Sequence, residues 1–442
     1  MTASDLPRTH VAEEAGGHVP MDSPTADLVR HLSAQRGEPE WMRRLRLRAL
    51  DHLRSSGVPS WASFLRDVDL EGIVRADPLQ GPGPGDSADP SLRPGVAALE
   101  ASEEAYRHLR HDLASRGIRF HGLTTALEQT PDLVRTHFAS VVAADDSPLA
   151  ALNATLWTGG SFLYVPPEVA VEVPLQAEIR EDYAGVEPFE RNLLIVDRGA
   201  DVTYIEGCTA PVYTPDELHV SAIEVVAMPG SRVRYIALQN FSRQVDNLVT
   251  KRAQVHEGAT VEWVDVNLGS RRSWKVPRAD LVGPGASAEF IGVGLAGAGQ
   301  SEEVGAEMVH LAPRTRSRIV NHAVVHRGGR ASLRSGVRVA TGATGVSSSI
   351  EWSSLMLDPD SRVQTVPSIE VDEADAQIGQ AGSVRTIGEE MLFYTSSRGV
   401  AEDEAVRMVV LGIASVATRR IPVEYAVEVE RLIELELGGG IG

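Results

Sequence analysis

A turn-and-strand phrase that recurs at nearly constant spacing is the feature that most restricts how this chain can fold. It occurs five times, as Gly199-Ala-Asp-Val, Gly230-Ser-Arg-Val, Gly258-Ala-Thr-Val, Gly285-Ala-Ser-Ala and Gly342-Ala-Thr-Gly. Successive copies are 31, 28, 27 and 57 residues apart, and Pro313-Arg-Thr-Arg lies near the midpoint of the double step. Glycine turns and short strands at a fixed period are typical of a solenoid, in which each coil buries its inner face against the next. We therefore predict a mainly β fold with a parallel β-solenoid core; a β-sandwich with coincidental turns is the alternative.

The hydrophobic period divides the rest of the chain into helical and irregular regions. Helical spacing precedes and follows the core, and five prolines and four glycines between residues 76 and 96 are typical of a linker. We predict the following organisation: a disordered tail at 1–22, helices at 23–75, a linker at 76–96, further helices at 97–149, the β-solenoid at 150–387, and C-terminal helices at 388–442.

Charge and cysteine content exclude several classes of function. The formal net charge is −19, which argues against binding to nucleic acid or to anionic membranes, because both require a basic surface. A single cysteine, Cys208, excludes an intramolecular disulfide and any zinc or iron–sulfur site that needs two thiolates from one chain. No apolar run is long enough to span a membrane, and the N-terminus lacks the features of a secretory signal. We predict a cytoplasmic protein.

Few motifs point to chemistry. Residues 292–297 match G-x-G-x-x-G, but no helix is predicted after them, and no P-loop motif occurs, so we expect this chain to bind no nucleotide. His322 and His326 lie on one face of a predicted strand but roughly 13 Å apart. Together with His310 they are candidate metal ligands, although exposed surface histidines are the favoured interpretation. Cys208 could carry sulfur or bind iron, or could be a small buried apolar residue.

Several long phrases resemble the SufB/SufD family of iron–sulfur cluster assembly proteins. They occur in the family's order: Trp157-Thr-Gly-Gly-Ser-Phe, Tyr204-Ile-Glu-Gly-Cys-Thr-Ala-Pro, Asn247-Leu-Val-Thr-Lys-Arg-Ala, Trp263-Val-Asp-Val-Asn-Leu-Gly-Ser and Gly388-Glu-Glu-Met-Leu-Phe-Tyr. The phrase Glu38-Pro-Glu-Trp-Met is more similar to the SufB branch than to SufD. The resemblance covers residues 24–75 and 97–442.

This resemblance implies a scaffold, not an enzyme, on which an iron–sulfur cluster is assembled transiently. It implies a right-handed parallel β-helix between helical regions, pairing with a second SufB/SufD-type subunit through the β-helix, and binding of a SufC-type ABC ATPase by the C-terminal helices. The candidate ATPase-docking residues are Phe393, Tyr394, Val406, Val409 and Val410, although the same side chains could pack on the β-helix.

Three positions depart from the family pattern. Trp352, in the phrase Glu351-Trp-Ser-Ser-Leu, stands where SufB proteins carry a late cysteine, and an indole neither accepts sulfur nor binds iron. The family's downstream histidine and glutamate positions are Gln380 and Ala381 here. Cys208 and Arg334 are retained. These substitutions leave two alternatives to a SufB-like scaffold: a SufD-like structural or regulatory subunit, or a sulfur or metal delivery protein that uses Cys208.

Overall fold

A computed structural model describes residues 18–20, 24–66, 68, 70, 92–94, 112–180, 189–210, 217–387 and 389–438. The predicted tail at 1–22 and linker at 76–96 lie outside the described residues except at 18–20 and 92–94. Residues 97–111 of the predicted second helical region are also outside them. Within the described ranges, no helix combines the length and the apolar character needed to cross a bilayer.

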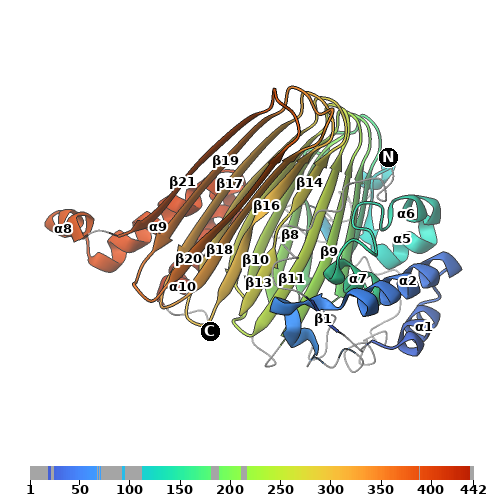
Figure 1. Ribbon diagram of the computed structural model, residues 1–442, viewed down its shortest axis with the longest axis horizontal. Coiled ribbons are helices and arrows are strands. Elements are labelled where there is room, and N and C mark those ends of the chain that lie inside the picture. The colour runs from blue at the N-terminus through green and yellow to red at the C-terminus, as the bar shows by residue number, and fades with distance from the viewer. Residues whose placement is uncertain are drawn as a thin grey trace.

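The core is a parallel β-solenoid, as predicted, and Figure 1 shows its coils stacked along the long axis. Successive strands alternate between two sheets. In the described residues, sheet I contains β3 (Leu92–Pro94), β6 (Leu175–Arg180), β8 (Asp201–Ala210), β10 (Arg232–Phe241), β12 (Thr260–Gly269), β15 (Ser287–Ala296), β17 (Arg316–Val325), β19 (Ser347–Met356) and β21 (Gln377–Thr386). Sheet II contains β4 (Arg119–Gly122), β5 (Ser161–Val165), β7 (Phe189–Val196), β9 (Glu217–Ala227), β11 (Val245–Val255), β13 (Arg272–Lys275), β14 (Arg278–Leu281), β16 (Ser301–His310), β18 (Arg330–Val339) and β20 (Arg362–Val371).

Four copies of the repeated phrase mark the turns that enter β8, β10, β12 and β15, and the fifth lies in the connection before β19. From β8 to β19, paired residues of neighbouring sheet I strands are 31, 28, 27, 29 and 31 positions apart. The glycines of the phrase have positive φ, between 63° at Gly258 and 90° at Gly342. Arg314 adopts the same conformation, with φ 58°, in the turn that lacks the glycine. The period in the sequence is therefore the length of one coil.

Helices cover parts of the outer faces of both sheets. Sheet I is covered by α9 (Glu402–Thr418) and α10 (Val423–Gly438), which follow α8 (Glu389–Ser397). The first coils of sheet II are covered by the N-terminal helices α1 (Ala26–Gln35), α2 (Glu40–Ser56), η2 (Ser60–Arg66), α5 (Leu123–Gln129), α6 (Pro131–His137) and α7 (Pro148–Leu156). The short strands β1 (His18–Val19) and β2 (Val58–Pro59) pair beside them.

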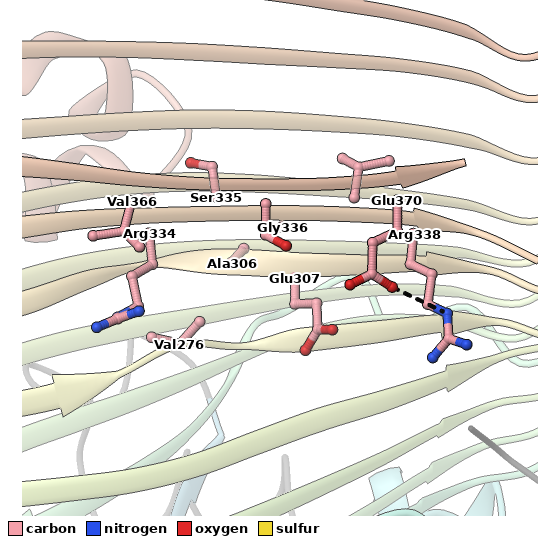
Figure 2. Close-up of a pocket in the computed structure, with 11 residues that line it drawn as sticks. Val276, Ala306, Glu307, Arg334, Ser335, Gly336, Arg338, Val366 and Glu370 are labelled. Carbon is pink, nitrogen blue, oxygen red and sulfur yellow. Dashed lines mark ion pairs between the residues drawn. The ribbon is translucent and has the colours of Figure 1, made fainter. Parts of the chain in front are cut away.

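Further along sheet II, a shallow cleft lies over β16, β18 and β20. Figure 2 shows Glu307, Arg334, Arg338 and Glu370 around it, with an ion pair of 3.8 Å between Arg338 and Glu370. The retained Arg334 pairs with Glu303. Its charge is therefore balanced within the sheet.

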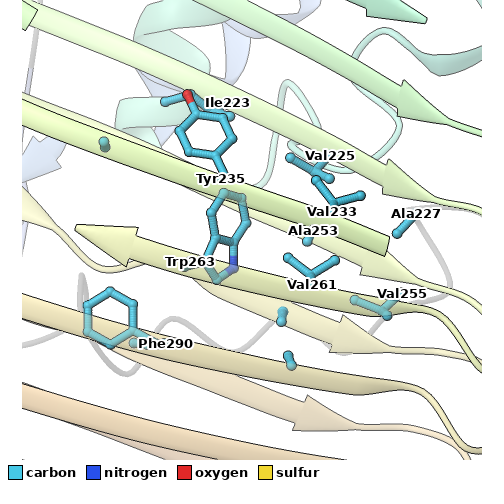
Figure 3. Packing of buried hydrophobic residues seen from close by; sticks show 14 of the residues in the cluster. Ile223, Val225, Ala227, Val233, Tyr235, Ala253, Val255, Val261, Trp263 and Phe290 are labelled. Atoms are coloured by element: carbon cyan, nitrogen blue, oxygen red, sulfur yellow. The ribbon is translucent and has the colours of Figure 1, made fainter. Parts of the chain in front are cut away.

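The interior between the two sheets holds the main hydrophobic core. Figure 3 shows Tyr235, Trp263 and Phe290 stacked above one another on successive strands of sheet I, opposite valines and alanines of sheet II. Ring centroids are 4.9 Å apart for Tyr204–Tyr235 and 5.1 Å apart for Tyr235–Trp263. Each coil buries its aromatic ring only by contact with its neighbours, which is why the coils must stack.

Candidate functional site

Buried charged residues occupy the solenoid interior beside the aromatic column. Moving along the strands from Tyr204 and Trp263, the next inward-facing residues are Glu206 on β8 and Asp265 on β12. Lys251 on β11 reaches across from sheet II, with its Nζ atom 2.9 Å from Asp265 Oδ1. Lys275 on β13 lies 3.5 Å from Asp265 Oδ2. Two ammonium groups therefore share one carboxylate inside the protein.

The pKa values in this cluster follow from burial and from the close pairing. Burial would raise the pKa of Asp265, but the adjacent Lys251 and Lys275 outweigh it and lower that pKa. Burial lowers the pKa of Lys251, with the attraction of Asp265 opposing the change. Burial and the neighbouring Glu190 raise the pKa of Glu206. Asp265 is thus the carboxylate that balances the lysines.

A second polar row runs beside this charged cluster. His219 Nδ1 lies 2.7 Å from Asn247 Oδ1, and Asn247 donates a 2.6 Å hydrogen bond to Gln239 Oε1. Lys275 donates to Asn267 Oδ1 at 3.0 Å, which connects the row to the charged cluster. All of these side chains are buried. The row therefore continues the polar interior toward the ends of the sheet I strands.

Cys208 belongs to this row by its backbone register. On β8 it is paired with Ile179 of β6 and Gln239 of β10, and Gln239 is paired with Asn267. The register line of the cysteine thus includes the amide residues Gln239 and Asn267.

Glu302 extends the polar interior by one more coil. It is paired in register with Ser273 on β13 and is 1% exposed. Burial raises the pKa of Glu302 to about 8, although Ser273 and Lys275 act in the opposite direction. The carboxyl group is therefore largely protonated at neutral pH.

Trp352 closes the interior at the C-terminal end. It lies on β19, paired in register with Asn321 of β17 and Gly382 of β21, and it packs against the main core. A Cβ atom on Gly382 would overlap the indole ring, so the ring lies directly over that glycine. Gln380 and Ala381 lie on β21 and are both exposed, paired with Ile350 and Glu351. The three substituted family positions are thus close together on the last two strands of sheet I.

The three candidate histidines do not form one site. His310 is fully buried between Thr315 and Ser317, and burial lowers its pKa to about 4. His326 is 4% exposed and lies 3.6 Å from Glu436. The expectation of exposed surface histidines is therefore wrong for both.

His322 is half-buried, with its Nδ1 atom 3.3 Å from the Ile413 carbonyl oxygen. Burial lowers the pKa of His322. Among the described residues, no group of three or more His, Cys, Asp or Glu side chains is arranged to hold a metal ion.

The five candidate docking residues divide into two groups. Phe393 and Tyr394 on α8 are 77% and 59% exposed. Val410 on α9 is 1% exposed, and Val406 and Val409 on the same helix are partly buried in the cluster against sheet I. The α9 valines thus attach the helix to the solenoid, while the α8 aromatic side chains face solvent.

Sequence reasoning missed the charged interior. Lys251 and Asp265 occur within the family phrases, but neither charge taken alone predicts a buried ion pair. The available signal is parity: Asp265 follows Val261 and Trp263 at alternate positions, so all three face the same side of one strand. A charged residue at an inward position of a strand predicts a buried partner, and only the fold shows that the partners are Lys251 and Lys275.

The fold and the interior site together define a β-solenoid scaffold with a polar interior and helical regions at both ends. Residues 180–413 match the model of the SUF system FeS cluster assembly SufBD core domain, and residues 101–177 match the SufBD protein N-terminal region. The iron–sulfur cluster assembly protein SufB of Bacillus subtilis is 38% identical over 95% of this chain and 94% of its own length. An iron–sulfur cluster assembly SufBD family protein of Staphylococcus haemolyticus is 39% identical over the same shares. The chain belongs to the SufBD family of iron–sulfur cluster assembly proteins, which confirms the predicted resemblance.

Proposed function

We propose that this chain is a SufB-like scaffold subunit of a cytoplasmic iron–sulfur cluster assembly complex that works with a SufC-type ABC ATPase and is not itself an enzyme. The observation that carries the proposal is the apolar surface on the C-terminal helices. Besides Phe393 and Tyr394, the exposed apolar side chains there are Met408, Val423, Val427 and Leu435. In Figure 1, α8 projects beyond the end of the solenoid. Exposed apolar surface of this kind is typical of a protein–protein interface.

The open end of the solenoid supports a second subunit. β20 and β21 are the last strands of the two sheets, and Ile369, Val371 and Val384 on them are 42%, 43% and 49% exposed. Unpaired strand edges with apolar side chains favour pairing with another chain. A SufB- or SufD-type partner, identical or different, would cover this end.

Trp352 favours a SufD-like structural or regulatory role as the second candidate function. The indole fills the interior position at which the family resemblance places a sulfur-accepting thiolate, and it leaves no thiol, imidazole or carboxylate there. A subunit of this type would contribute partner binding while a competent SufB chain holds the cluster.

The polar interior along the Cys208 register supports a third possibility, sulfur delivery through that residue. Lys251 and Lys275 supply positive charge to the solenoid interior, and positive charge would favour a bound sulfur in anionic form. Metal delivery would need ligands that His310, His322 and His326, with their separate partners, do not supply together.

Co-purification with a SufC-type ATPase tests docking through α8. We expect Phe393→Ser/Tyr394→Ser to abolish co-purification, because these side chains are exposed and their loss leaves the core intact. The comparison variant is Val423→Ser/Val427→Ser, which removes exposed apolar side chains from α10. Retention of the ATPase by this variant would restrict docking to α8. Docking through α8 is wrong if the α8 variant retains the ATPase as well as the wild type does.

Anaerobic reconstitution with iron and sulfide distinguishes the three functions. A chromophore with near-stoichiometric iron, lost on Cys208→Ser, supports a working scaffold. A colourless protein that still pairs with an ordinary SufB chain supports the SufD-like role. A protein that acquires sulfur on Cys208 without iron supports sulfur delivery.

A further inference from the structure

A cleft of about 670 Å³ lies between α2 and the C-terminal end of α6. Figure 1 shows these helices at the N-terminal end of the molecule, on the outer side of sheet II. The cleft is lined by Glu40, Trp41, Arg44, Leu45, Arg48, Arg135, Phe138 and Ala139. None of the family phrases or the proposed partner contacts involves these arginines.

The floor of the cleft is apolar and fixed in position. Leu45 and Phe138 are buried, and Trp41 is half-buried with its ring edge-on to Phe138 at 6.2 Å. Behind the floor, the Arg191 guanidinium lies 4.6 Å from the Phe138 ring centroid and is itself paired with Glu224. This support holds the aromatic surface rigid, so an incoming side chain pays little ordering entropy on the protein side.

The walls of the cleft are cationic in a chain whose net charge is −19. Trp41, Arg44 and Arg48 recur at helical spacing and therefore lie on one face of α2. Arg135 comes from α6 on the opposite wall. Within the described part of the chain, neither Arg48 nor Arg135 forms an ion pair, and both are exposed. Arg44 shares Glu40 with Arg43.

We propose that the α2–α6 cleft binds an acidic peptide segment of a partner protein, in which carboxylates flank an apolar side chain. Guanidinium groups on both walls match carboxylates in fork geometry, and the apolar floor accepts the side chain between them. The arginine walls are open to solvent, whereas small-molecule sites bury most of the ligand, so an extended chain lying along α2 fits better. A positive patch on a negative protein attracts acidic segments and leaves basic ones unbound.

The test uses the full-length protein and fluorescence anisotropy of a rhodamine-labelled hexapeptide, Glu-Glu-Leu-Glu-Glu-Leu. At an ionic strength of about 50 mM, where screening is weak, we expect Arg48→Gln/Arg135→Gln to weaken peptide binding about tenfold. The matched control, Arg232→Gln/Arg316→Gln, removes two exposed charges from β10 and β17 outside the cleft and should bind as the wild type does. A peptide with glutamine in place of glutamate should not bind.

Three results would overturn the proposal. The first is equal peptide affinity of the cleft variant and the control variant, which would show that binding depends on net charge and not on the cleft. The second is full displacement of the peptide by millimolar pyrophosphate, which would make the cleft a small-anion site. The third is no binding of the acidic peptide to the wild type. ATPase co-purification is measured separately, so either proposal can fail without the other.

Discussion

The buried cluster around Asp265 predicts that Asp265→Asn lowers the free energy of unfolding more than Lys251→Met does. Asp265 is 1% exposed at its side chain and serves Lys251 at 2.9 Å and Lys275 at 3.5 Å. Asp265→Asn leaves two buried ammonium groups without their carboxylate. Removing one partner of a buried ion pair costs about 3–5 kcal/mol. We expect the lower end, about 3 kcal/mol, because Glu206 also attracts both lysines and can ionise in compensation.

Lys251→Met is the comparison that makes this prediction specific. It leaves Asp265 paired with Lys275, and it replaces a buried ammonium by an apolar group of similar length. We therefore expect a smaller loss, about 1–2 kcal/mol, from the broken hydrogen bond and the lost contact with the Tyr235 ring. Urea unfolding followed by tryptophan fluorescence at pH 7 measures both variants, and Trp263 lies beside the cluster as a local reporter.

The sign of the pH dependence provides an independent check. Burial lowers the pKa of Lys251, and Asp265→Asn removes the carboxylate that opposes this change, so the unfolded chain binds more protons than the folded one as the pH approaches 10. The loss of stability should therefore shrink between pH 7 and pH 10. The reasoning is refuted if Asp265→Asn costs less than Lys251→Met, or if its loss grows as the pH rises.

Three further predictions concern single positions in the solenoid. Burial raises the pKa of Glu302 from 4.5 to about 8, so the folded state keeps a proton that the unfolded chain loses. Stability therefore falls as the pH rises from about 4.5 to 8. Over this range the melting temperature of Glu302→Gln should rise relative to that of the wild type. Burial lowers the pKa of His310 from 6.5 to about 4, so the unfolded chain binds a proton that the folded state does not, and stability is lost as the pH falls through that interval. The urea midpoint of His310→Gln should therefore change less with pH than that of the wild type. Gly382→Ala should cost about 1–3 kcal/mol by displacing Trp352, and Trp352→Leu in the same chain should recover most of the loss in thermal unfolding; no recovery would contradict the contact.

The coil architecture could be predicted from the sequence because its signal is repeated. The glycine phrase recurs five times, and in four copies its glycine lies two residues before a sheet I strand. In the fifth copy Gly342 lies five residues before β19, and Gly345, also with positive φ, takes the equivalent position. The sixth turn carries Arg314 in the left-handed conformation. Only the period predicts this turn, because arginine has no turn preference of its own.

The candidate site could be predicted only in part. The family phrases locate Cys208 and the substituted position Trp352, but linear spacing does not show that Lys275 and Asn267 meet across the interior. The histidines show the opposite error. Polar residues are normally exposed, yet His310 is buried because Thr315 and Ser317 satisfy both of its ring nitrogens.

The register columns of the solenoid also set where compensating substitutions should be sought. Side chains that touch across sheet I are 27 to 31 residues apart in the chain, from β8 to β21. Trp352 and Gly382, 30 positions apart, form one such pair, in which a large ring requires a neighbour without a side chain. A relative with a small residue at the position of Trp352 is therefore free to carry a larger one a single coil later. Residue sizes at positions one coil apart should therefore vary together among relatives.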